Sequence, residues 1–151
     1  MPDLVIVAID GSDLALHAAE QGVALLQPIG QVVLCTVIEP SDPTLVVGTG
    51  TASGVMSPAE LDTLDMARQN EAHEHLETAA KALNLPNAEQ LLSIGDPPVA
   101  LCELASERGA DAIVMATRGR GGIKRALLGS VSDHVVRNAP CPVVIVRPKD
   151  D

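Results

Sequence analysis

A glycine-rich basic segment at residues 116–130 has the residue types of an anion-binding site. Its sequence is Ala-Thr-Arg-Gly-Arg-Gly-Gly-Ile-Lys-Arg-Ala-Leu-Leu-Gly-Ser, with Arg118, Arg120, Lys124 and Arg125 inside eight positions. Glycines let the main chain approach a ligand closely, and amide groups at a helix start favour an anion. A phosphate site is the simplest interpretation, and a solvated loop with ordinary turns is the alternative.

An aspartate near the N-terminus is the second candidate. Asp10 follows the apolar run at residues 4–9 and precedes Gly11 and Ser12. Its carboxylate can accept hydrogen bonds from ligand hydroxyl groups, or it can simply close a turn before a helix. Its position directly after an expected strand favours the ligand role.

The distribution of charge restricts the kind of ligand. The chain has 151 residues and a net charge of −10, and it contains no Phe, Tyr or Trp. A broad basic face for nucleic acid is therefore not expected, and base stacking on aromatic rings is impossible. The basic segment is local, which predicts one small anionic ligand and no nucleic acid partner.

Other features restrict the location of the protein. No apolar run approaches the roughly 20 residues of a membrane helix, and the N-terminus does not have the pattern of a signal peptide. Cys35, Cys102 and Cys141 are far apart in apolar runs, which predicts buried reduced thiols. We expect one domain over residues 1–151, cytoplasmic and without membrane insertion.

Apolar runs alternate along the chain with amphipathic stretches, and these elements must position the candidate residues. The expected strands are at residues 4–9, 31–38, 89–95, 112–115 and 143–146. The expected helices are at 13–27, 58–83, 97–108 and 131–136, with Ser12, Ser57, Asp96 and Ser130 as N-caps. This order predicts an α/β fold with a parallel sheet, helices on both faces and a long loop at 39–57.

Parallel sheets of this kind bind ligands at the carboxyl ends of strands, where the winding reverses direction. Asp10, Val37 and Met115 all lie at such ends of the expected strands. The first helix presents mostly small residues on its inner face, so it can pack close to the sheet. Those residues are Ala15, Ala18, Ala19, Gly22 and Leu26.

These motifs together resemble the universal stress protein family. Its nucleotide-binding members carry Gly-x2-Gly-x9-Gly-Ser/Thr after the fourth strand and an aspartate after the first. Here Gly119, nine spacers, Gly129 and Ser130 match the motif, Asp10 matches the aspartate, and residues 141–146 resemble the last strand. The resemblance covers essentially the whole chain. It departs at Ala116, which adds a methyl group where the family has its first glycine.

The resemblance implies a five-stranded parallel sheet in the order 3-2-1-4-5, adenine nucleotide alpha hydrolase-like. It also implies ATP binding, with Mg²⁺ or Mn²⁺, and a role as a nucleotide-dependent stress-response regulator. Asp10 is expected to hold the ribose. The other residues implied are Ala8, Val37, Met115 and Ala116 around the adenosine, and Arg118, Gly119, Arg120, Gly129, Ser130 and Val131 around the phosphates. A homodimer through residues 143–146 is also implied.

Two alternatives stay open. The chain can be a family member that has lost nucleotide binding and serves as a protein-interaction module, which Ala116 favours. It can also bind AMP or another adenylate signal in the same pocket.

Motifs of other protein classes are weak. No Gly-Lys-Ser/Thr follows a Walker A glycine pattern, and His73, Glu74 and His75 fit a solvated helix face better than a metal site. Ser132, Asp133 and His134 are neighbours on one helix and cannot form a catalytic triad. We expect no dedicated enzyme, with slow ATP hydrolysis left open.

Overall fold

The computed structural model describes residues 1–45, 56–117 and 128–147. Its strands are β1 (Leu4–Ala8), β2 (Gln31–Ile38), β3 (Glu89–Ile94), β4 (Ala112–Ala116) and β5 (Val143–Val146). Its helices are α1 (Asp13–Leu26), α2 (Pro58–Ala82), α3 (Pro97–Arg108), α4 (Ser130–Asn138) and the 3-10 turn η1 (Pro43–Leu45). None of the helices in these ranges is both long and apolar enough to cross a membrane.

The five strands form one parallel sheet in the order β3-β2-β1-β4-β5, which confirms the predicted topology. The chain winds outward from β1 through β2 to β3, and then crosses back to β4 and β5 on the other side. The winding therefore reverses between β1 and β4, where the polypeptide connections leave in opposite directions.

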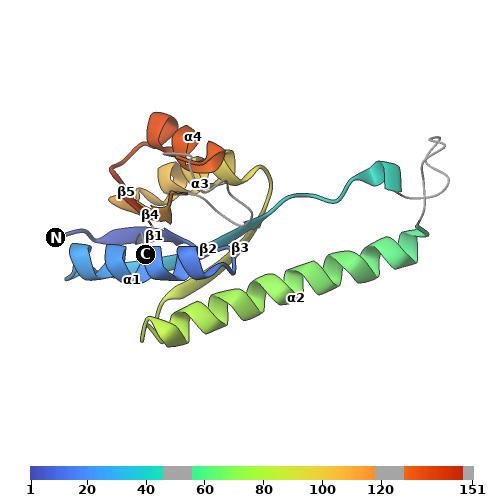
Figure 1. Ribbon diagram of the computed structural model, residues 1–151, viewed down its shortest axis with the longest axis horizontal. Helices are drawn as coiled ribbons and strands as arrows, with labels where there is room; N and C mark the ends of the chain where they lie inside the picture. Colours follow the sequence, from blue (N-terminus) through green and yellow to red (C-terminus); the bar gives the residue numbers. More distant parts are fainter. Residues whose placement is uncertain (46–55, 118–127, 148–151) are drawn as a thin grey trace.

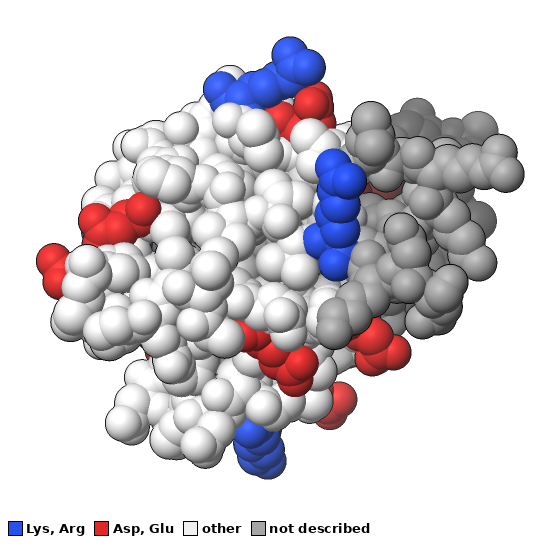
Figure 2. Space-filling view, turned by 60° about the vertical axis from the view of Figure 1, so that its left-hand side comes forward, with Lys and Arg blue, Asp and Glu red and all other residues white. Residues whose placement is uncertain are grey.

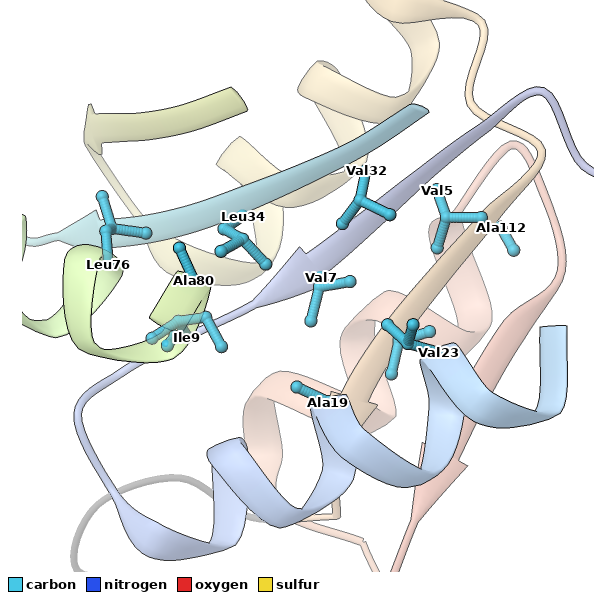
Figure 3. Close-up of a cluster of buried hydrophobic side chains, with 12 residues drawn as sticks. Val5, Val7, Ile9, Ala19, Val23, Val32, Leu34, Leu76, Ala80 and Ala112 are labelled. Atoms are coloured by element: carbon cyan, nitrogen blue, oxygen red, sulfur yellow. The ribbon is translucent and has the colours of Figure 1, made fainter. Parts of the chain in front are cut away.

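Helices cover both faces of the sheet, with α1 and α2 on one face and α3 and α4 on the other (Figure 1). Val5 and Val7 of β1 belong to the cluster under α1 and α2, shown in Figure 3, whereas Ile6 belongs to the opposite cluster. This alternation explains why the central strands are continuous apolar runs, since every side chain meets a core.

Helix α1 packs very close to β4, as its small inner-face residues predicted. Ala15, Ala18, Ala19 and Gly22 are all buried. A Cβ added at Gly22 would lie 2.9 Å from Cγ2 of Val114 and closer still to Cγ1. Gly22 is therefore the point at which the helix backbone rests against the side chain of the strand.

Helix α2 is attached to the sheet by its C-terminal half. It begins with a capping box between Ser57 and Glu60, and its buried residues are Ala72, Leu76, Ala79 and Ala80. The N-terminal half extends beyond the sheet together with η1 (Figure 1). The Arg68 Nη2 group donates to the Glu39 carbonyl at 2.7 Å, so the first part of the 39–57 segment is held against α2. Residues 46–55 of this expected loop lie outside the described ranges.

One of the four expected helix N-caps was wrong. Gly129, not Ser130, is the N-cap of α4, because its extended backbone places its carbonyl to accept the Asp133 amide at 2.9 Å. Asp96 is the N-cap of α3 as predicted, although its side chain makes no capping hydrogen bond. Strand β4 also continues one residue further than expected, to Ala116, which pairs with Val146 of β5.

The cysteines differ in accessibility. All three are free, but only Cys35 is fully buried, so the expectation was wrong for Cys102 and Cys141, which are half-buried. Burial raises the pKa of the Cys35 thiol to about 12. Burial also raises the pKa of the other two thiols.

We expect iodoacetamide to alkylate Cys102 and Cys141 in the folded protein well before Cys35. At pH 8 only about one Cys35 thiol in ten thousand is the reactive thiolate, and the surrounding core blocks the reagent. Peptide mass spectrometry over a time course measures the three rates. Labelling of Cys35 as fast as Cys141 in the folded protein would contradict this burial.

Candidate functional site

The strand register aligns the candidate residues along one edge of the sheet. Ala8 pairs with Cys35 of β2, and Val7 pairs with Val114 of β4. Continuing this register two and three residues further sets Asp10 level with Val37 on one side and with Thr117 on the other. These positions are the carboxyl ends of β1, β2 and β4, next to the reversal of winding.

The main chain remains ordered beyond β1 up to this edge. The Ile9 amide donates to the Cys35 carbonyl at 2.8 Å, and the buried Thr36 hydroxyl donates to the Ile9 carbonyl at 2.8 Å. Asp10 therefore leaves the sheet from a backbone position that is held by two hydrogen bonds.

The Asp10 side chain closes a tight turn into α1. Its Oδ1 accepts the Ser12 amide at 2.9 Å and the Ser12 hydroxyl at 2.5 Å. Ser12 in turn caps α1, because its Oγ accepts the Ala15 amide at 3.1 Å. Gly11 adopts a φ of +82°, a conformation that glycine adopts without the steric penalty of a side chain. The carboxylate is therefore oriented in advance at the edge of the sheet.

The two ends of the glycine-rich segment are tied together at its base. The Gly129 amide donates to the Thr117 carbonyl at 2.5 Å, while the Thr117 amide donates to the Val146 carbonyl at 3.1 Å. The Ser132 hydroxyl, which is 1% exposed, also donates to the Thr117 carbonyl at 2.5 Å. Thr117 thus connects β4, β5 and the first turn of α4.

The N-terminus of α4 lies at the same edge, since Gly129 is bonded to Thr117 at the end of β4. The first amide that bonds within the helix is that of Asp133, so the amides of Ser130 and Val131 precede the internal ladder. The N-cap is a glycine, which has no side chain to occupy those amides. Amides of this kind, with the positive end of the helix dipole, attract an anionic group.

Only some of the side chains expected to contact the adenine are accessible. Ala8 and Val37 are half-buried, whereas Met115 is 6% exposed and packs in the core cluster under α3 and α4. Ala116 is 8% exposed, and Asn84 is the one non-glycine residue with a positive φ in the described ranges. Ala116 therefore has a backbone conformation that alanine adopts without strain.

Three of the expected phosphate residues, Arg118, Gly119 and Arg120, lie outside the described residues, as does Lys124. The structure brings together Ala8, Asp10, Val37, Met115, Ala116, Gly129, Ser130 and Val131 around one edge of the sheet. The sequence analysis did not identify Thr117, or the role of Ser132 in holding the Thr117 carbonyl. The signal for Ser132 was its place three residues before the buried Val135, on the inner side of α4.

We expect Ser132→Ala to lower the stability of the protein, because it weakens the junction between β4 and α4 at the base of the glycine-rich segment. The Thr117 carbonyl would lose its bond from a buried hydroxyl, at a cost of about 1–2 kcal/mol in the free energy of unfolding. Urea denaturation measures this loss. Ser130→Ala is the matched control, because Ser130 is exposed on the same turn and should leave stability within about 0.5 kcal/mol of the parent. Equal effects of the two changes would contradict the assignment.

The fold and this edge define an α/β protein whose candidate ligand site lies at the reversal of winding of a parallel sheet. The model of the universal stress protein family matches residues 1–147. The chain therefore belongs to the universal stress protein family.

Individual relatives agree with this membership. A universal stress protein of Thermus aquaticus, encoded in the QAH/OAS sulfhydrylase 3′ region, is 35% identical over 144 residues, covering 95% of this chain and 97% of its own. The solved structure of the protein MJ0577 shares the fold, with a TM-score of 0.74 and 22% identity over 99% of this chain and 98% of that one. A universal stress protein solved in complex with cAMP has a TM-score of 0.66 and 27% identity, covering 98% of both chains.

Proposed function

We propose that this protein binds ATP at the carboxyl edge of its sheet and acts as a nucleotide-dependent regulator of a stress response. The observation that carries the proposal is that the oriented Asp10 carboxylate and the N-terminal amides of α4 lie at the same edge of the sheet, on either side of the reversal of winding. The cAMP complex of a related protein supports an adenine nucleotide as the ligand class.

Each part of the nucleotide has a chemically suited group at this edge. Asp10 accepts hydrogen bonds from the ribose hydroxyls, and the amides of Ser130 and Val131 donate to phosphate oxygens. The aliphatic surface of Ala8 and Val37 receives the adenine ring in place of an aromatic stack. The other proposed contacts are Met115, Ala116, Gly129 and, from the glycine-rich segment, Arg118, Gly119 and Arg120.

The metal enters with the nucleotide in this proposal. Among the residues that the structure describes, no group of three His, Cys, Asp or Glu side chains is arranged to hold an ion. Mg²⁺ or Mn²⁺ is therefore proposed to be held mainly by the phosphates and water, as is usual for these ions.

The proposed function is binding rather than catalysis. The Ser132 hydroxyl is committed to the Thr117 carbonyl, and Asp133 pairs with Arg137 at 3.1 Å, so neither residue orients His134. The three residues therefore do not form the relay of a hydrolase.

Identification of a co-purified ligand tests the proposal directly. The protein is purified without added nucleotide and denatured, and the released small molecules are identified by mass spectrometry. ATP or ADP in near-stoichiometric yield supports the nucleotide switch. An empty site, with no heat of binding when ATP and Mg²⁺ are titrated into the protein, overturns it.

A second candidate is an adenylate with one phosphate, which the cAMP complex of the related protein favours. Parallel titrations with ATP, AMP and cAMP rank the three ligands. If none binds, Ala116→Gly tests whether the extra methyl group is the obstacle. Binding gained by that variant would show that the methyl group excludes the nucleotide, and would support the alternative of a family member that has lost nucleotide binding.

We also propose a homodimer through β5, an edge strand. The Ile113 and Thr117 amides donate to the carbonyls of Pro142 and Val146. Because hydrogen-bonded residues alternate along a strand, the amide and carbonyl groups of Val143 and Ile145 point away from β4. Figure 2 brings forward the side of the molecule that carries β5 in Figure 1, and most of this face is uncharged. An unpaired strand beside uncharged surface favours pairing with a second copy.

We expect Val143→Pro to convert this dimer to monomer. Proline removes an outward amide that the second copy needs and no amide that bonds to β4. Sedimentation velocity at micromolar concentration measures the state. Val136→Ala, at an exposed position on α4, is the control and should remain dimeric. A monomeric parent protein would contradict the proposal.

A further inference from the structure

One histidine of α2 packs against the turn that follows β1, at the edge of the sheet where we propose that the nucleotide binds. A Cβ added at Gly11 would lie 2.5 Å from Nδ1 and 2.6 Å from Nε2 of His75, with Cε1 closer still. Because the three ring atoms are almost equally near, the imidazole presents its face, not its rim, to Gly11. The expectation that His75 belongs to a solvated helix face was therefore wrong.

A carboxylate lies beside the imidazole, and the helix that carries the ring is anchored in the core. The His75 Nε2 atom lies 3.7 Å from Oε1 of Glu71, one turn earlier on α2, and the His75 side chain is 24% exposed. The next residue, Leu76, is fully buried in the same cluster as Ile9, which immediately precedes the Asp10 turn (Figure 3). This packing fixes the part of the α2 backbone from which the ring reaches Gly11.

Gly11 lies between the two residues that form the Asp10 turn. Asp10 Oδ1 accepts both of its bonds from Ser12, on the far side of Gly11. The ring of His75 thus covers the backbone of the turn whose carboxylate we assign to the ribose. The charged groups to consider are Glu71, beside the ring on its own helix, and Asp10 and Asp13, which lie within two residues of Gly11 along the chain.

We propose that His75 is a positioning residue whose protonation strengthens the binding of anionic adenylates, which makes ligand affinity depend on pH. This inference rests on the proposed adenine nucleotide site. Histidine is the side chain whose ordinary titration falls between pH 5 and 8. Protonation places a positive charge beside a site that otherwise carries the Asp10 carboxylate, so an anionic ligand is held more tightly as the pH falls.

Cyclic AMP and adenosine are the matched probes. ATP and AMP take up a proton on phosphate near pH 6, which would add their own pH dependence. The phosphodiester of cAMP keeps its single charge through this range, and adenosine has none. An effect of the imidazole charge must therefore appear with cAMP and be absent with adenosine.

The experiment measures the Kd of both probes at pH 5.5 and 8.0 by calorimetry. We expect cAMP to bind the parent protein roughly fivefold more tightly at pH 5.5, and adenosine to bind equally at both. His75→Gln keeps a polar side chain over Gly11 but cannot titrate, so its cAMP affinity should not change with pH. His73→Gln is the matched control, because His73 is exposed on the same helix and should leave the parent profile intact.

The outcomes separate the two levels of the proposal. Binding of cAMP that does not change with pH, or a pH dependence that His75→Gln retains, overturns the assignment to His75 while the nucleotide site stands. If neither probe nor ATP binds the parent protein, the proposed function and this inference both fail.

A measurement on the parent protein guards against a variant that misfolds. The NMR signal of the His75 Cε1 proton is followed against pH with each probe bound. Because the coupling is reciprocal, cAMP should move the midpoint of this titration to higher pH, relative to the adenosine complex. Identical midpoints would overturn the inference without reference to any variant.

Discussion

Replacing Asp10 with alanine is expected to weaken ATP binding by at least about a hundredfold, because two charge-assisted hydrogen bonds to the ribose are lost. The change also removes the acceptor of the Ser12 amide and hydroxyl, so the turn before α1 loses its orientation. Calorimetric titration with ATP and Mg²⁺ measures the affinity.

Two further variants separate the two roles of this carboxylate. Asp10→Asn keeps an oxygen that can accept both bonds from Ser12 but removes the negative charge, so its loss of affinity should be smaller than that of Asp10→Ala. Asp13→Asn removes an exposed carboxylate three residues away, on the first turn of α1, and should bind as the parent does. Unchanged affinity in a folded Asp10→Ala protein would contradict the assignment of the ribose site.

Replacing Gly22 with valine is expected to destabilise the fold by about 3 kcal/mol, the upper part of the range for overpacked cores. The new side chain would occupy space that Val114 already fills, since a Cβ alone would lie 2.9 Å from Cγ2 and closer still to Cγ1. Helix α1 would have to move away from β4, which opens the core under α1 and α2. For a chain of this size the melting temperature should fall by roughly 6–12 °C.

Urea denaturation of this variant measures the free energy of unfolding. Gln21→Val is the matched control, because it introduces the same side chain at the neighbouring exposed position of α1 and should cost only about 0.5 kcal/mol. Equal stability of the two variants would show that α1 does not rest on β4 through Gly22.

Local signals in the sequence predicted most of the fold. Ser12 and Ser57 were recognisable as N-caps because a capping hydroxyl acts on amides within three residues of itself. The apolar runs predicted the strands because each central strand is covered on both faces. Asp10 was recognisable as a candidate site residue because all strands of a parallel sheet have their carboxyl ends at one edge, whatever their order.

The tertiary structure decided which residues from different elements meet at that edge. Neither the bond from Ser132 to the Thr117 carbonyl nor the ring of His75 over Gly11 follows from spacing along the chain. Both depend on the rotation and height at which α4 and α2 pack on the sheet, and these are determined by the buried side chains of the two cores. Local periodicity therefore determined the elements and the edge, whereas long-range packing determined the contacts that shape the site.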